Sequence, residues 1–362
     1  MESFVKTAFP FIVISVGILL AFQGVLMIVA YTVLAERKVL GWIQGRIGPN
    51  RVGPWGVLQP FADLLKFIFK EDIVPDKSTR FVYFLAPMVA LTCALLPIVV
   101  YPFGPSITTI DWTFLPYGLG EGIHFLPLTI AKIDVGVLFV LGITSVGVYG
   151  IALAGWSSNS KYSLMGGLRS SAQMISYELA MGASVIGVVM LAGTLDLNGI
   201  IYAQINSPFR WFIIPQIIGF FVFLIAAFAE TNRVPFDLPE AETELVAGFH
   251  TEYSALKFAL FFMAEYVNMF TVSVMCTVLF LGGWYMPGLS HLFEVGSIPY
   301  ALASHVIFIG KICAFLFLFI WIRGTLPRFR FDQLMNFGWK FLLPVALGNV
   351  ILTIVVVFFL NR

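Results

Sequence analysis

Long apolar runs dominate this chain and restrict what it can fold into. Crossing a lipid bilayer takes roughly 20 mostly apolar residues in a helix. We count eight such runs, at about 10–34, 81–103, 133–154, 173–192, 211–229, 258–282, 302–322 and 340–360. The runs lack the alternation of strands, and lipid cannot satisfy open backbone polar groups. We therefore predict an all-α integral membrane protein, a single bundle of eight transmembrane helices over residues 1–362.

Composition supports a membrane protein and argues against several other classes. The chain is 59% hydrophobic and 11% charged, whereas soluble domains are about 25% charged. Its net charge of +1 does not suit a nucleic-acid partner. Cys93, Cys276 and Cys313 lie far apart, so neither a disulfide framework nor a metal site is indicated. No dinucleotide fingerprint, P-loop or nucleophile elbow is present, and no histidine pair suits a haem. We expect no redox centre, metal or tightly bound cofactor in this chain.

The distribution of Lys and Arg predicts the orientation in the membrane. The loops after the first, third, fifth and seventh runs hold 16 of them, and the opposite side holds four. Positive side chains are retained on the cytoplasmic side. Both termini are therefore expected on the outer side, periplasmic in a bacterium. The first apolar run is too long for a signal peptide and no transit peptide precedes it, which favours the inner membrane of a bacterium.

The first inward loop contains a further helix with a different design. The Gly/Pro-rich connector "RIGPNRVGPWG" is typical of tight turns. After it, apolar residues recur at helical spacing, while Asp63, Lys66 and Lys70 occupy the other face. A segment this short and charged does not span. We predict an amphipathic helix over 57–70 that lies in the membrane interface. Packing beneath a soluble partner is the alternative.

Three ionisable residues fall inside predicted spans: Glu178, Glu265 and Lys311. Each costs several kcal/mol at membrane depth unless it faces protein or water. A carboxyl held in such a place suits a proton relay. Lys311 is equally compatible with reaching the interface through its long side chain. The short glutamates have less reach, which favours a functional role for Glu178 and Glu265.

Acidic residues are concentrated in the loop 230–257, which contains "ETNRVPFDLPEAETELVAGFHTEYS". In "DLPE", Asp237 and Glu240 also suit a helix start. Glu240 and Glu244 would face the same side of a helix, with Glu242 between them. The opposing charges in the loop are few, so the acids should share protons and respond to nearby charge. A solvated acidic loop is the simpler alternative.

The acidic loop, "AERKVLGWIQGRIGPNRVGPWGVLQPFADLLKFIFKED", "GWSSNSKYSLMGGLRSSAQMISYE" and "IWIRGTLPRFRFDQLMNFGWK" together resemble one family. It is the H subunit (subunit 1 in mitochondria) of proton-pumping NADH:quinone oxidoreductase, respiratory complex I. The resemblance covers essentially the whole chain. It does not extend convincingly to residues 283–301.

The resemblance implies a role and partners. The subunit would join the membrane arm to a peripheral arm whose subunits carry FMN and iron–sulfur clusters, and it would form a chamber for quinone, the substrate. The residues implied or inferred at the chamber and its entrance are Arg46, Arg51, Val57, Phe61, Asp63, Lys66, Glu230, Arg233 and Asp237. Those expected to couple quinone reduction to proton translocation are Glu178, Glu240, Glu242, Glu244, Glu252 and Glu265. The alternatives are the related subunit of a membrane-bound hydrogenase or other dehydrogenase, and a stand-alone secondary transporter.

Overall fold

The computed structural model describes residues 2–105, 129–237 and 246–360, and within these ranges all regular structure is helical. The elements are α1 (Glu2–Ile43), η1 (Pro54–Gly56), α2 (Gln59–Phe69), α3 (Arg80–Leu95), η2 (Leu96–Val100), α4 (Gly136–Ser157), α5 (Lys161–Ala192), α6 (Leu197–Asn206), α7 (Ile217–Glu230), η5 (Gly248–His250), α9 (Ala255–Phe280), α10 (Leu289–Leu292), α11 (Ile298–Thr325), α12 (Phe331–Phe337), η6 (Gly338–Leu342) and α13 (Leu343–Leu360). The predicted all-helical membrane class is therefore confirmed.

The number of spanning helices is less clear than their nature. Seven of the described helical segments are long and apolar enough to cross a membrane. The run expected at 211–229 is helical only from Ile217 to Glu230. Fourteen residues at 1.5 Å each give about 21 Å, short of the roughly 30 Å hydrocarbon layer. Pro215 explains the late start, because proline cannot donate a hydrogen bond within a helix.

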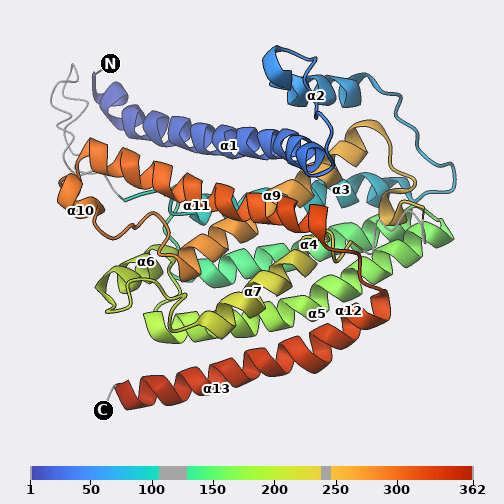
Figure 1. Ribbon diagram of the computed structural model, residues 1–362. Helices are drawn as coiled ribbons and strands as arrows, with labels where there is room; N and C mark the ends of the chain where they lie inside the picture. The colour runs from blue at the N-terminus through green and yellow to red at the C-terminus, as the bar shows by residue number, and fades with distance from the viewer. Residues whose placement is uncertain (1, 106–128, 238–245, 361–362) are drawn as a thin grey trace.

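The helices form a bundle in which α5 and α9 are the most enclosed and α1 and α13 lie at the periphery (Figure 1). Both termini are at the same end of this bundle, and α7 carries the chain from that end to the opposite one. Helix α5 contacts α4, α7 and α13, while α9 packs against α3 and α11. The end opposite the termini collects the segments that follow α1, α4, α7 and α11.

Small residues allow close helix contacts where the site is built. A Cβ at Gly155 of α4 would lie 3.1 Å from the Cα of Gly167 in α5. A Cβ at Gly166 would lie only 2.6 Å from the Cα of Gly248 in η5. Small side chains at such positions let backbones approach, as is common between membrane helices. The segment around Phe249 and His250 is thereby held directly against α5.

A buried polar contact joins α13 to the turn before α7. The Gln216 amide donates to the Thr353 hydroxyl at 2.7 Å, and the Asn349 amide donates to the Gln216 carbonyl oxygen at 2.7 Å. All three side chains are at most 4% exposed. Their mutual satisfaction removes the penalty of polar groups inside a membrane protein.

Lys311 of α11 reaches the chain beyond α9 instead of the membrane interface. Its ammonium donates to the backbone carbonyls of Leu281 at 2.7 Å, Gly283 at 2.9 Å and Tyr285 at 2.7 Å. The last carbonyls of a helix have no partner within the helix and attract cations. Lys311 therefore closes the termini-side end of α9, a structural role between the two interpretations that the sequence left open.

Candidate functional site

Arg233 lies at the centre of a buried ion-pair network at the end of the bundle opposite the termini. Its guanidinium is 3.7 Å from the Glu36 carboxylate of α1 and 3.6 Å from the Glu265 carboxylate of α9. Arg323 of α11 donates a hydrogen bond to Glu36 as well. The network thus connects three helices to the loop after α7. A planar guanidinium with five donors suits such bridging better than an ammonium.

Tyr266 supports this network with its hydroxyl and its ring. The hydroxyl donates to the Glu36 carboxylate at 2.7 Å. The Arg233 guanidinium lies over the ring, 4.1 Å from its centroid. Such cation–π contacts are strongest where water is excluded, and both residues are buried. Tyr266 therefore fixes the guanidinium between the two carboxylates.

A histidine and an aspartate extend the charged cluster in two directions. The His250 Nε2 lies 3.7 Å from the Glu265 carboxylate. Asp237 is buried, and its carboxylate accepts a hydrogen bond from Arg328 at 3.2 Å. A histidine near a carboxylate is a group whose charge changes near neutral pH. The cluster therefore combines fixed charges with groups that exchange protons.

A second carboxylate pair lies deeper between α4, α5 and α7. Glu178 of α5 accepts a hydrogen bond from Ser145 of α4. Glu230, the buried last residue of α7, interacts with Glu178 and with the Thr144 side chain. Two carboxylates that interact this closely do not ionise independently. This pair is suited to holding a shared proton.

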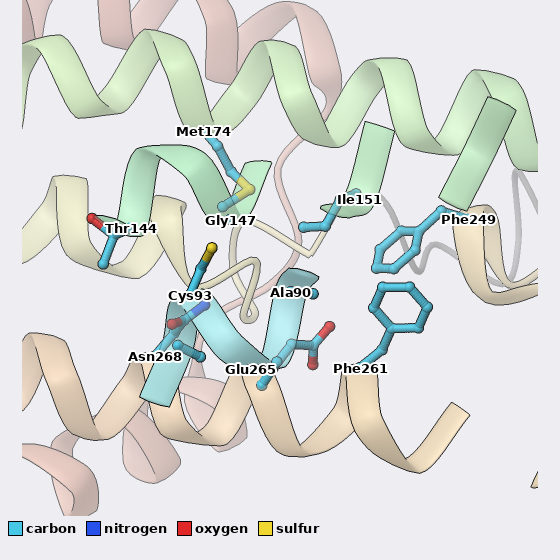
Figure 2. A pocket seen from close by; sticks show the side chains of 12 residues that line it. Ala90, Cys93, Thr144, Gly147, Ile151, Met174, Phe249, Phe261, Glu265 and Asn268 are labelled. Atoms are coloured by element: carbon cyan, nitrogen blue, oxygen red, sulfur yellow. The ribbon is translucent and has the colours of Figure 1, made fainter. Parts of the chain in front are cut away.

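A small cavity separates the two groups (Figure 2). Its volume is about 20 Å³, and its polar lining comes from Glu265 and Asn268 of α9 and Thr144 of α4. A site that holds one buried water needs roughly 10–15 Å³ and two to four polar partners. Figure 2 shows Glu265 and Asn268 rising from the same helix toward Ala90 and Cys93. The cavity has the size and polarity for a single bridging water.

A larger hollow lies beside the connector before α2. It measures about 590 Å³, and its lining includes both Arg46 and Arg51 as well as Arg37 of α1. The Arg37 guanidinium donates to Asp63 of α2 at 2.7 Å, which fixes α2 to the end of α1. This volume is in the range of sites for small organic ligands, about 300–1,000 Å³.

Helix α2 presents apolar and charged side chains to its surroundings. Val57, which precedes the helix, and Phe61 are 41% and 44% exposed. Lys66 is exposed as well, and no residue of α2 is buried. The helix also contacts α1 and α9. An unpartnered apolar face at this position can meet lipid or an apolar substrate.

Glu252 is the predicted site residue that the described contacts do not bring into the cluster. Its backbone carbonyl accepts a hydrogen bond from Tyr83 at 2.6 Å, and Tyr253 beside it stacks on Tyr83 at 4.2 Å. Burial raises the pKa of Tyr253 to about 12, so its hydroxyl stays protonated at neutral pH. This segment therefore serves as an anchor. Glu240, Glu242 and Glu244 lie outside the described residues.

Three members of the network were not predicted from the sequence: Glu36, Tyr266 and Arg323. They come from α1, α9 and α11, far apart in the chain. One available signal was Glu36 in "LAERK", an acid directly at the end of the first apolar run. Its role depends on contacts across 230 and 287 residues, with Tyr266 and Arg323 respectively.

The fold and the site together define a polytopic helical membrane protein with a buried ion-pair network at one end. Residues 16–354 match the family described as NADH dehydrogenase. A second H subunit of the NADH-quinone oxidoreductase of Koribacter versatilis is 53% identical, over 93% of this chain and 95% of that protein. Subunit 8 of the NADH-quinone oxidoreductase of Rhodothermus marinus is 49% identical, over 92% and 94%.

A third relative, the H subunit of the NADH-quinone oxidoreductase of Leptospira biflexa, is 51% identical over 92% of this chain and 91% of that protein. The chain belongs to this family, the H subunits of NADH-quinone oxidoreductase, respiratory complex I. It is thus a multi-pass membrane subunit of an oxidoreductase complex. Among the described residues no group of His, Cys, Asp and Glu is arranged to hold a metal.

Proposed function

We propose that this subunit forms the access route and part of the chamber for quinone, and that it couples quinone reduction to proton translocation. The observation that carries the proposal is Arg233, buried between the Glu36 and Glu265 carboxylates. A charge that appears beside this network changes the balance between the two carboxylates. Buried ion pairs respond strongly to such a change because water screens them little.

The route for quinone begins beside α2. A long isoprenoid tail needs an apolar opening to lipid, which Val57 and Phe61 offer between α1, α9 and the interfacial helix. Arg46 and Arg51 line the neighbouring hollow, where arginines can contact an acidic partner surface or the polar head of a quinone. Lys66 on the exposed side of α2 would face anionic lipid or the peripheral arm.

The quinone head is reduced by a peripheral subunit, because the reaction needs electrons that FMN and iron–sulfur clusters of partner subunits deliver. Glu265 passes the resulting protonation change inward through a water in the small cavity. Glu178 and Glu230 receive it. Asp237 and the acids Glu240, Glu242 and Glu244, with Glu252, share the protons on the cytoplasmic side. This relay leads toward the other membrane-arm subunits.

The orientation rests on the Lys and Arg distribution. The network end would face the cytoplasm of a bacterium, with the protein in the inner membrane and both termini in the periplasm. That places Arg233 and its carboxylates where a peripheral arm can dock, and it leaves Lys311 on the periplasmic side.

Exchange of Glu265 for Gln tests the coupling role in the assembled complex. The expected result is a loss of proton translocation in sealed vesicles, with a fall in NADH:quinone activity if the two processes are tightly coupled. The control is Glu71→Gln, since Glu71 is exposed after α2. The double change Glu240→Gln with Glu242→Gln tests the acidic loop in the same assay. Normal quinone reduction and normal pumping in both variants would refute the relay.

A further inference from the structure

An apolar cavity of about 480 Å³ opens between α7, α11 and α12, away from α2. Gln333 is the sole polar residue among the described residues that line it. The lining residues are Leu224, Ile225, Phe228, Pro235, Phe236, Ile322, Leu326, Phe329, Gln333, Leu334 and Phe337. Leu326 and Phe329 are 48% and 43% exposed, so the cavity communicates with the surface of the bundle.

A basic linker runs along the rim of this cavity. The sequence "RGTLPRFR" joins α11 to α12, and Phe329, which lines the cavity, stands between Arg328 and Arg330. Arg328 bonds Asp237 with one nitrogen yet is 44% exposed, and Arg330 is exposed. Lys340 is exposed close to the cavity residue Phe337 in sequence. The rim therefore carries an excess of positive charge beside an apolar slot.

We propose that this cavity binds one anionic phospholipid, with an acyl chain in the slot and the phosphate between Arg328 and Arg330. Basic pockets between membrane helices on the positively charged side recognise anionic lipid head groups. Burial of acyl methylene groups adds a favourable apolar contribution. A quinone ring carries no charge to match the two arginines. A soluble protein does not supply a chain that fits an apolar slot at the depth of Leu224.

The bound lipid would touch the segment that holds the Arg233 network. The Phe329 backbone N–H donates to the Pro235 carbonyl at 3.1 Å. The Phe329 ring stacks on Phe236, with centroids 5.6 Å apart. Arg328 itself pairs with Asp237. A phosphate at Arg328 therefore shares this guanidinium with a residue of the candidate site.

Photo-crosslinking in the intact complex tests the proposal. The complex is placed in nanodiscs that contain a diazirine-acyl phosphatidylglycerol or the phosphatidylcholine with the same acyl chains. Labelled peptides are then mapped by mass spectrometry. We expect phosphatidylglycerol to label the peptides with Leu224–Phe228 and Leu326–Phe337 more than phosphatidylcholine does.

Two variants separate the head group from the chain. Arg330→Gln, which leaves the Arg328–Asp237 pair intact, should lower the phosphatidylglycerol labelling about fivefold and leave phosphatidylcholine unchanged. Leu326→Trp should fill the slot and reduce labelling by both lipids. Lys161→Gln is the matched control, an exposed cation at the start of α5 at the same end of the bundle.

Three results would overturn the proposal. Equal labelling by the two lipids in the unaltered complex would show that the rim does not select charge. Labelling of a partner subunit in place of these peptides would show that protein covers the slot. Displacement of the lipid label by a long-tailed quinone, with no effect of Arg330→Gln, would assign the cavity to the quinone tail.

Discussion

Tyr266 provides the most selective test of the network at the scale of single residues. Tyr266→Phe removes the hydroxyl that donates to Glu36 at 2.7 Å and keeps the ring against Arg233. A hydrogen bond to a charged group contributes about 1.5–3 kcal/mol. We expect quinone reductase activity of the assembled complex to fall about tenfold or more. Tyr266→Leu, which also removes the ring, should lower it further.

The comparison of these two variants isolates the role of the hydroxyl. Subunit content on native gels shows whether the complex assembles in each case. The control is Tyr149→Phe, because Tyr149 is 66% exposed on α4. Unchanged activity in an assembled Tyr266→Phe complex would mean that the network does not support quinone chemistry.

Individual site residues were predictable to different degrees. Glu178, Glu265, Arg233 and Asp237 were found because a charge inside or beside an apolar run is conspicuous. Glu36 is equally close to an apolar run, yet nothing local distinguishes it from the basic residues that follow it. Its importance arises only when α1, α9 and α11 come together. Local composition therefore reveals charged candidates, whereas their partners follow from packing.

At the scale of elements, apolar length located the helices and proline set one of their limits. The runs at 133–154 and 258–282 correspond to α4 and α9 because nothing inside them interrupts helical hydrogen bonding. Pro215 lies inside the run at 211–229, and the helix there begins after it. Mean hydropathy does not register the missing N–H of proline, so a run can be apolar throughout and yet be helical only in part.

The polar contact that joins α13 to the turn before α7 gives a prediction at this scale. Asn349→Leu removes the donor to Gln216, and one buried amide oxygen then lacks its partner. We expect the unfolding temperature of the solubilised complex, or the resistance of this subunit to proteolysis, to decrease. The loss should correspond to about 1–3 kcal/mol.

A second variant makes that prediction specific. In Gln216→Leu with Asn349→Leu, both amides are gone, and part of the stability should return because no buried polar group is left alone. Additive losses in the double variant would contradict the direct contact. Ile351→Leu, on the exposed side of α13, is the control.

Lys311 yields a further prediction on an element. Lys311→Met leaves three backbone carbonyls beyond α9 without their ammonium donor. The expected effect is a less stable subunit, measured as a lower unfolding temperature, with an unchanged ratio of protons moved to NADH oxidised in the complex that assembles. Lys311→Arg should retain much of the stability. A changed proton ratio at normal stability would instead assign Lys311 to the proton path.

On the scale of the whole molecule, the site joins segments from nearly the full length of the chain at one end of the bundle. Helices α1 and α9 supply carboxylates, the loop after α7 supplies the central arginine, and α11 closes the network. The hollow beside α2 and the small cavity behind Glu265 lie on opposite sides of it. A substrate that arrives from lipid would meet the network before any proton reaches the deeper carboxylates.

This arrangement makes the entrance beside α2 testable by the length of the quinone tail. Phe61→Trp or Val57→Trp narrows an apolar opening through which a long tail must remain threaded while the head reacts. A short tail leaves the opening free. We therefore expect the KM to rise, or kcat to fall, several-fold for a long-tailed quinone and little for a short-chain analogue, measured with the assembled complex. Phe81→Trp, at an exposed site on α3, is the control. Equal effects on both quinones would place the entrance elsewhere.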